Sequence, residues 1–352
     1  MSKPLVRVLR FSYLLALGLY FLTGSARADL VWNAQTGWRV DGGVLSGLTG
    51  TEGRNALDLM NKARAAEEKE NYASAASTYE KIAKKYINSI YAPEALYRAA
   101  RARLARKQYN KAFEDFQEVI RQYPNTKRFN EIIGEQYRIT SALLDGARNR
   151  IFWGLIPSFT NREKAVQNFE VVLNNAPYSD YAPLALMNIT RGHQRLGNHE
   201  EAIDALDRLI NNYPQHLLLP DAYLKLAQTH ASLVEGPEYD QASSRDATSY
   251  YEDFMILFPN DPNVSAAAKG ASDMKTMLAS SKVRMGDFYF YKRDNYTAAK
   301  VLYNEAITVY PDSEIAVLAR KKLVAVEAKA TGKPAPANAP STEPKKKRFW
   351  LF

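Results

Sequence analysis

A short pattern recurs six times in this 352-residue chain, and no other feature restricts the fold as strongly. Each copy has an alanine, a large apolar residue four positions later, and a helix-ending position eleven residues after the alanine. In the last five copies, proline follows that position directly. The copies run from Ala75 through Tyr79 to Tyr86, from Ala112 through Phe116 to Tyr123, from Ala165 through Phe169 to Ala176, from Ala202 through Leu206 to Tyr213, from Ala247 through Tyr251 to Phe258, and from Ala299 through Tyr303 to Tyr310.

This register predicts an amphipathic helix in every copy. Positions 0, +4, +8 and +11 lie on one stripe of an α-helix. A small residue at position 0 lets a neighbouring helix approach closely, and the residue at +4 fills the space beside it. Proline at +12 disfavours helical geometry at +11, so each helix is expected to stop there after about three turns.

A second set of prolines marks an earlier helix in three of the copies. Pro93, Pro183 and Pro220 are predicted to lie in a first helical turn, where a missing N–H costs nothing. Pro93 lies 19 residues before Ala112, and Pro183 lies 19 residues before Ala202. The repeating unit is therefore predicted to be helix–turn–helix.

The alanine spacings of 37, 53, 37, 45 and 52 residues fit a basic unit of 37 with insertions of 16, 8 and 15. We expect these insertions at residues 145–161, at residues 234–239, and as a longer first helix over residues 265–291. Such units, with alanine in the second helix and proline at its end, are typical of tetratricopeptide repeats. We therefore predict an all-α fold, an α-solenoid of about six tetratricopeptide-like hairpins over residues 55–329, the last with a long first helix.

The first 28 residues predict a secretory signal peptide. A basic start precedes an apolar stretch over residues 11–23 and then Ala26-Arg27-Ala28, an A-x-A cleavage pattern. Arg27 inside that pattern leaves an uncleaved anchor as the alternative. The chain has no cysteine, so it can form no disulfide and offers no cysteine for a lipid.

Charge argues against nucleic acid as a partner. The formal net charge is +9, but residues 1–28 contribute +4 and residues 333–352 another +4, which leaves the rest of the chain near +1. Such a balance does not predict a broad basic face for binding phosphates.

Two segments flank the predicted solenoid. Residues 29–54 form an N-terminal arm with Trp32 and Trp38. This arm is interpreted either as a cap that packs on the first hairpin or as a peptide that docks on a partner. Residues 330–344 are a Pro/Ala linker without the apolar residues that a core requires.

The last eight residues combine four cations with four apolar residues, an arrangement suited to a membrane surface. The cations would meet anionic headgroups, and the aromatic rings would lie at the interface. The alternative is a chain end without a role. This tail, residues 345–352, comprises Lys345, Lys346, Lys347, Arg348, Phe349, Trp350, Leu351 and Phe352.

No catalytic, metal-binding or cofactor-binding pattern stands out, so we expect a protein that is not an enzyme and takes no cofactor. His193 and His199 are six residues apart, which suits neither one helix face nor a usual metal spacing. The sequence contains no phosphate-binding loop and no dinucleotide fingerprint.

The insertion after residue 145 is one candidate for protein binding. It carries the apolar residues Ile151, Phe152, Trp153 and Leu155. Insertions in repeat proteins often project from one face and contact a partner or a membrane. The alternative is that this segment folds back onto its own unit and becomes core.

The concave face of the first units is a second candidate. It is expected to be lined by Tyr97, Arg98, Arg101 and Arg103. Tyrosine and arginine are residue types that anchor binding partners such as extended peptides. The alternative is an ordinary solvated basic face.

The repeats resemble the BamD-like family, outer-membrane β-barrel assembly factors built from tetratricopeptide repeats. The likeness rests on residues 71–79 and 91–95 in the first units, on residues 247–261, and on the long last hairpin with residues 289–299 and 309–313. It covers about residues 55–325. The chain departs from the family in its lack of cysteine, its sixth hairpin, its aromatic insertion and its tail.

The resemblance implies a periplasmic, non-enzymatic scaffold, peripherally associated with the outer membrane. Its partners would be the barrel-forming assembly subunit and unfolded outer-membrane proteins. Because the family is usually lipidated on a cysteine, attachment here would come from partners or from residues 345–352. The alternative function is a periplasmic tetratricopeptide adaptor that coordinates cell-wall synthesis or envelope constriction. Such adaptors often carry an N-terminal coiled coil, whereas residues 29–54 show no heptad pattern.

Overall fold

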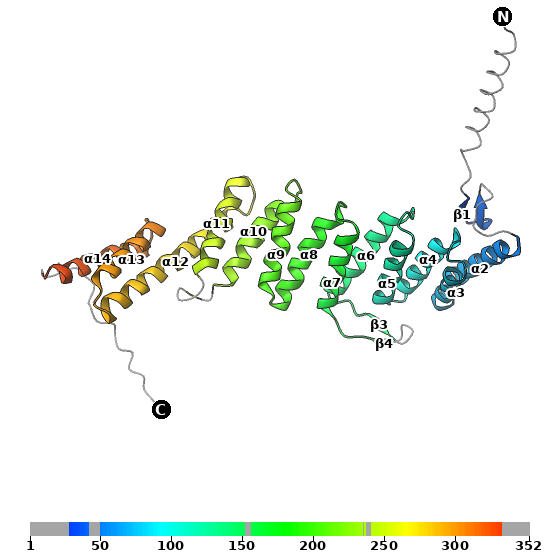
Figure 1. Ribbon diagram of the computed structural model, residues 1–352, viewed down its shortest axis with the longest axis horizontal. Helices are drawn as coiled ribbons and strands as arrows, with labels where there is room; N and C mark the ends of the chain where they lie inside the picture. Colours follow the sequence, from blue (N-terminus) through cyan, green and yellow to red (C-terminus); the bar gives the residue numbers. More distant parts are fainter. Residues whose placement is uncertain (1–27, 42–49, 152–155, 235, 237–240, 333–352) are drawn as a thin grey trace, which may run out of the picture. The chain divides into compact units, whose positions relative to one another are not determined.

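The computed structural model describes residues 28–41, 50–151, 156–234, 236 and 241–332. Within these ranges the chain is almost entirely helical, which confirms the predicted all-α fold of tetratricopeptide-like hairpins (Figure 1). The helices belong to two compact units, divided between Ala182 and Pro183. The predicted signal peptide up to residue 27 and the predicted tail, residues 345–352, lie outside the described residues.

The described residues of the first unit form three helix pairs. They are α2 (Gly50–Glu68) with α3 (Tyr72–Lys85), α4 (Tyr91–Ala105) with α5 (Tyr109–Gln122), and α6 (Phe129–Leu144) with α7 (Arg162–Asn175). The described residues of the second unit form three more pairs and a final helix. The pairs are α8 (Tyr181–Leu196) with α9 (His199–Asn212), α10 (Leu219–Ser232) with α11 (Gln241–Leu257), and α12 (Val264–Lys292) with α13 (Tyr296–Val309), and the final helix is α14 (Glu314–Thr331). The first two residues of α8 belong to the first unit.

Two short antiparallel ribbons accompany the helices of the first unit. Strand β1 (Asp29–Asn33) pairs with β2 (Gly37–Asp41) ahead of α2. Strand β3 (Arg150–Ile151) pairs with β4 (Ile156–Pro157) in the connection between α6 and α7. Neither ribbon was predicted from the sequence, and neither was the final helix α14.

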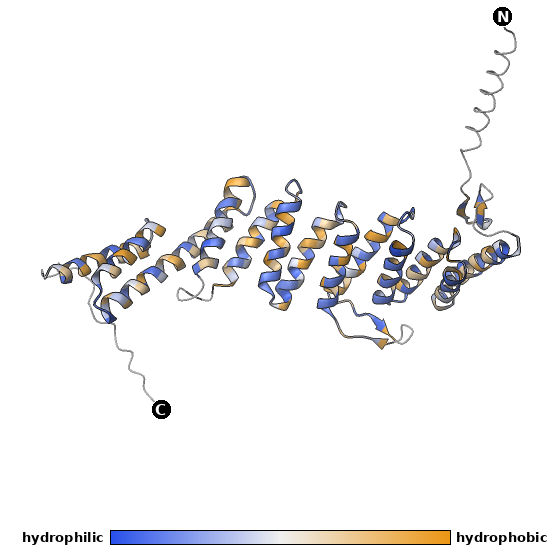
Figure 2. Ribbon diagram, in the orientation of Figure 1, coloured by the Kyte–Doolittle hydropathy of each residue, from blue (hydrophilic) through white to orange (hydrophobic). Residues whose placement is uncertain are grey.

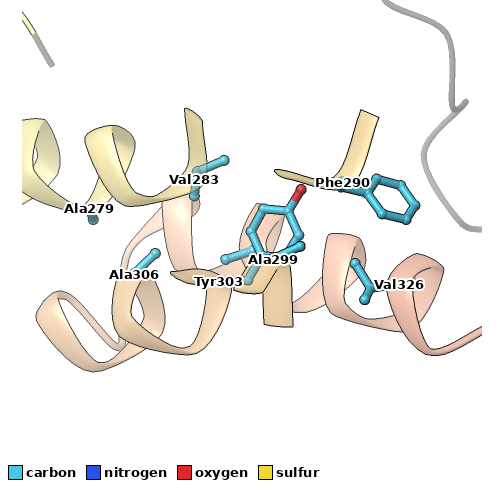
Figure 3. Close-up of a cluster of buried hydrophobic side chains, with 8 residues drawn as sticks. Ala279, Val283, Phe290, Ala299, Tyr303, Ala306 and Val326 are labelled. Atoms are coloured by element: carbon cyan, nitrogen blue, oxygen red, sulfur yellow. The ribbon is translucent and has the colours of Figure 1, made fainter. Parts of the chain in front are cut away.

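The six repeat alanines are fully buried, as their register predicts. Each lies in the first half of a second helix and has an exposed fraction of 0%. The residues at +4 are buried as well, and the largest exposed fraction among them is 6%, at Tyr251. Figure 3 shows the last copy, in which Ala299 and Tyr303 of α13 lie among Val283 of α12 and Val326 of α14. The small alanine therefore sits where helices approach, and the ring beside it fills the core.

Each second helix ends where the pattern predicts, one residue before position +11. Position +11 is a C-cap residue in five units, and its N–H donates to the carbonyl four residues earlier. In the remaining unit, α11 ends at Leu257, directly before Phe258. Three second helices also begin on an asparagine cap, whose side chain accepts from the N–H three residues later. These caps are Asn71, Asn161 and Asn295.

A left-handed backbone residue recurs in the turn between paired helices. Glu70, Lys107, Gly197 and Asp294 have φ values of 57°, 56°, 79° and 48°, and each precedes its repeat alanine by five residues. Only one of them is glycine, the residue that adopts this conformation without strain. The two units with insertions between their helices do not share this turn position.

The insertions lie where the spacing predicts. The connection between α6 and α7 spans residues 145–161, and that between α10 and α11 spans residues 233–240. In the last hairpin the extra residues lengthen α12, which has 29 residues. Among the described helices, none is both long enough and apolar enough to span a bilayer, and Figure 2 shows hydrophilic and hydrophobic residues mixed along them.

Candidate functional site

The first helices α2, α4 and α6 present a ladder of ion pairs. Arg98 of α4 lies 3.6 Å from Glu67 of α2 and 2.9 Å from Glu94 of its own helix. Glu94 in turn accepts from Arg128, which directly precedes α6, at 3.0 Å. The side chains of Glu67, Glu94 and Arg98 are less than a fifth exposed. The ladder therefore joins three consecutive first helices through partly buried charges.

The ladder continues along α4 and α6. Arg101 lies 3.5 Å from Glu131 and 3.4 Å from Glu135, and it donates to the hydroxyl oxygen of Tyr97 at 3.0 Å. Tyr97 donates that hydroxyl proton to Glu131. Burial, with the neighbouring Glu131 carboxylate, raises the pKa of Tyr97 to about 12. Burial alone would raise the pKa of Glu131, but hydrogen bonds from Tyr97 and Arg128 outweigh it and lower that pKa.

The structure brings together three of the four residues predicted on this face. Tyr97, Arg98 and Arg101 all belong to the ladder, and Arg101 is the most accessible of them, with 45% of its side chain exposed. Arg103 does not belong with them: it pairs with Glu80 of α3 at 2.8 Å and with Asp115 of α5. Two residues along a helix correspond to a turn of about 200°, so Arg103 lies on the opposite side of α4 from Arg101.

The ribbon β1–β2 lies against the first-helix face. The N–H of Trp38 donates to Asn61 of α2 at 2.7 Å, and the Trp38 side chain is only 4% exposed. Arg98 lies over the Trp38 ring at 5.3 Å. Asp29 pairs with Lys127, ahead of α6, at 2.5 Å. Residues 29–41 therefore pack on the chain itself, as the cap interpretation of the N-terminal arm expects.

The ribbon β3–β4 is held at its base and exposed beyond it. The N–H of Arg150 donates to the carbonyl of Lys107 at 2.9 Å. Ile151 is 39% exposed, Ile156 50% and Phe159 95%, so these described residues do not become core, in contrast to one of the two interpretations of the insertion. Figure 1 shows the ribbon extending away from the helices. The predicted contact residues Phe152, Trp153 and Leu155 lie outside the described residues.

The sequence reasoning missed the acidic half of the ladder. Glu94, Arg98 and Arg101 follow one another at intervals of four and three residues, which is the spacing of one helix face. That spacing was available in the sequence. The pairing of Glu94 with Arg128 was not, because it depends on how closely α4 and α6 approach.

Two family models match the chain. A tetratricopeptide repeat model matches residues 94–126. The YfiO model, described as an outer membrane lipoprotein, matches residues 158–337, slightly more than half of the 352 residues. No curated protein matches the chain.

Solved tetratricopeptide proteins are similar to the chain at low identity and low TM-score. A protein from Parabacteroides merdae is 12% identical over 78% of this chain and 98% of that chain, with a TM-score of 0.32. MamA from Desulfovibrio magneticus is 16% identical over 61% of this chain and 99% of that chain, with a TM-score of 0.31. PilW, a type IV pilus biogenesis factor, is 16% identical over 76% and 98%, with a TM-score of 0.28.

The YfiO match takes in every helix from α7 to α14. The tetratricopeptide match takes in most of α4 and all of α5. Both agree with the resemblance drawn from the repeats. The chain belongs to the YfiO family of BamD-like outer membrane lipoproteins.

Proposed function

We propose that this protein is a periplasmic, non-enzymatic scaffold in the assembly and insertion of outer-membrane β-barrel proteins. The observation that carries the proposal is the family match over residues 158–337. The fold supports it, because stacked helical hairpins expose extended faces that hold protein partners. The partners proposed are the barrel-forming assembly subunit and unfolded outer-membrane proteins.

The first-helix face is the proposed contact for a folded partner. Its ladder fixes Tyr97 and Arg98 in place, and Arg101 remains accessible at its edge. An ordered array of paired charges favours specificity and orientation more than affinity. A folded domain with its own complementary charges fits such a surface better than a flexible apolar chain does.

Attachment to the outer membrane is a separate part of the proposal. The sequence has no cysteine, so it lacks the residue through which a bacterial lipoprotein carries its lipid. We assign peripheral attachment to partners and to the tail, residues 345–352, with its four cations and four apolar residues. A single short amphipathic signal of this kind binds weakly by itself, so the partner contact and the tail would act together.

A native pull-down tests the proposed function. The mature chain is purified from solubilised envelopes, and co-purifying proteins are identified by mass spectrometry. Recovery of the barrel-forming assembly subunit, and its loss when Arg101 is changed to Glu, supports both the function and the contact face. Recovery of cell-wall synthesis or constriction proteins in its place would replace the assembly role with that of an adaptor.

A further inference from the structure

A pocket of about 310 Å³ opens on the face formed by second helices in the first unit. It lies between α5 and α7, and its walls include the apolar side chains of Phe113 and Val171. The amides of Gln117 and Asn168 line it as well, and Lys164 and Glu114 stand at its edge. This face is distinct from the first-helix face that carries the ion-pair ladder.

Asn168 provides a buried hydrogen-bond donor at this pocket. The residue is only 3% exposed, and its side-chain Nδ2 is buried without a hydrogen-bond partner within the described part of the chain. A buried donor without a partner costs stability, because it has lost water and gained nothing in exchange. An acceptor oxygen brought into the pocket would satisfy it.

The amide of Gln117, which lines the pocket, is already engaged by two other amide side chains. Gln117 and Asn175 bond to each other in both directions, at 3.1 and 2.7 Å. Gln136, which is fully buried, donates to the same Gln117 oxygen at 2.9 Å. These three side chains hold one another in place beside the pocket, and none of their printed hydrogen bonds is made with Asn168.

The charges at the edge indicate a neutral ligand. Lys164 and Glu114 form no ion pair with any described residue, and they have opposite signs. Glu118 also lines the pocket, but it is ion-paired with Arg121. Lys164 and Glu114 then balance each other, and such a lining does not favour a ligand of net charge. A peptide group, with a carbonyl dipole and no net charge, matches both the edge and the Asn168 donor.

A hydrogen bond joins one end of the pocket to the ribbon β3–β4. Asn149, at the base of the ribbon, accepts from the N–H of Asn110, another residue at the pocket. Beyond it lie Ile151 and Ile156, which are 39% and 50% exposed. A chain that left the pocket in this direction would reach these exposed apolar side chains beyond Asn149. This favours an extended polypeptide over a small molecule.

We propose that this pocket and the ribbon together bind an extended, apolar polypeptide segment. A main-chain carbonyl of the segment accepts from Asn168 Nδ2, an apolar side chain contacts Phe113 and Val171, and the following residues lie along Ile151 and Ile156. The inference rests on the function proposed above, since it assigns the unfolded outer-membrane protein to this face.

Peptide binding to the purified full-length chain tests the proposal. The probe is a fluorescent decapeptide of alternating valine and serine, acetylated and amidated so that it has no charge. Asn168→Asp keeps the size of the side chain but replaces the donor with an acceptor, and Asn168→Leu removes hydrogen bonding. Each should weaken binding about tenfold. Asn304→Asp, on the exposed surface of α13, is the matched control and should bind as the original chain does.

A second measurement keeps the test valid if the Asn168 variants fold poorly. A photo-crosslinking residue at position 114 should capture the peptide, whereas one at position 201, on the exposed start of α9, should not. Wild-type affinity in both folded Asn168 variants, no binding by the original chain, or equal crosslinking at both positions would overturn the proposal. If the pull-down fails to recover the assembly subunit but the peptide binds through Asn168, the proposed function fails and the pocket stands.

Discussion

The ring of Tyr303 on α13 lies directly against the backbone of Gly286 on α12. A Cβ atom placed on Gly286 would stand 2.6 Å from the Tyr303 ring carbon Cε1. The ring cannot easily turn away, because its hydroxyl donates to Asp287 at 2.7 Å and its carbons are packed among the buried residues of Figure 3. The Tyr303 ring is therefore accommodated by the absence of a side chain at Gly286 on the facing helix.

Gly286→Ala should destabilise the last hairpin despite the higher helix propensity of alanine. The overpacked contact is expected to cost about 1–3 kcal/mol, against a gain of about 1 kcal/mol in propensity. Urea unfolding would measure the difference. The same change made in a Tyr303→Leu background should be neutral or stabilising, because the ring is gone. Destabilisation of equal size in both backgrounds would contradict this account of the glycine.

Ala112→Leu and Ala202→Leu should each overpack a second helix. Both alanines have an exposed fraction of 0%, so the added atoms have no space, and a loss of about 1–3 kcal/mol is expected. Ala65→Leu, on the exposed side of α2, is the matched control and should change stability by less than about 0.5 kcal/mol. Thermal midpoints equal to that of the original chain would show that the register is wrong.

The left-handed turn offers a pair of opposite predictions. Glu70, at φ 57°, should be replaced by glycine with a gain of about 0.5–1 kcal/mol, since glycine adopts this conformation without strain. Gly197→Ala, at the corresponding position of a later unit, should lose about 1–2 kcal/mol for the reverse reason. Denaturant midpoints of the two variants should move in opposite directions. Movement in the same direction would mean that backbone conformation does not decide the outcome.

Asp115 should make stability depend on pH between about 4 and 6. Burial raises the pKa of Asp115 to about 6, although the Arg103 guanidinium opposes the rise, whereas its ordinary value is 3.8. The folded chain thus holds this proton more tightly than the unfolded chain. The resulting stability is fully present below pH 3.8 and is lost as pH rises through 6.

Asp115→Asn cannot titrate, so this component should vanish. Stability measured by urea unfolding from pH 4 to pH 7 should vary less in the variant than in the original chain. Asp58→Asn, at an exposed position of α2, serves as the control and should leave the profile unchanged. A profile that keeps its slope in Asp115→Asn would show that another group is responsible.

Deletion of residues 345–352 should shift the protein from the membrane fraction to the soluble fraction. The expected cause is the joint loss of headgroup attraction and apolar insertion. A variant with the four cations changed to glutamine should show a partial shift, and the membrane binding that remains should no longer weaken with salt. Unchanged fractionation after the deletion would end the anchoring hypothesis and leave partners as the means of attachment.

What the sequence predicted well was local. Ala165, Phe169 and Ala176 occupy one helix stripe and one helix end, and their positions follow from spacing within a single helix. The two inter-helix insertions were located in the same way, by measuring from one proline or alanine to the next. None of these inferences requires knowledge of which helices meet.

The features that the sequence did not predict depend on which helices pack against one another. Glu94 and Arg128 are 34 residues apart, and only the packing of α4 and α6 makes them a pair. Arg103 was grouped with Arg101 because both are basic and near in sequence, but they lie on opposite sides of α4. Asn168, three residues after its repeat alanine, was a detectable polar interruption of the buried stripe. That its donor has no partner was not detectable, because this depends on how other helices pack around it.

The way in which the second helices end affects where such a chain can accept added sequence. Each second helix has its own terminating residue, and three of the six also have their own asparagine cap, so the alignment of a second helix depends mainly on its own sequence. The unit that contains the connection between α6 and α7 is 16 residues longer than the basic unit of 37, and Ala165 is nevertheless fully buried. That connection is therefore a site at which a binding segment can be inserted while the helices keep their packing.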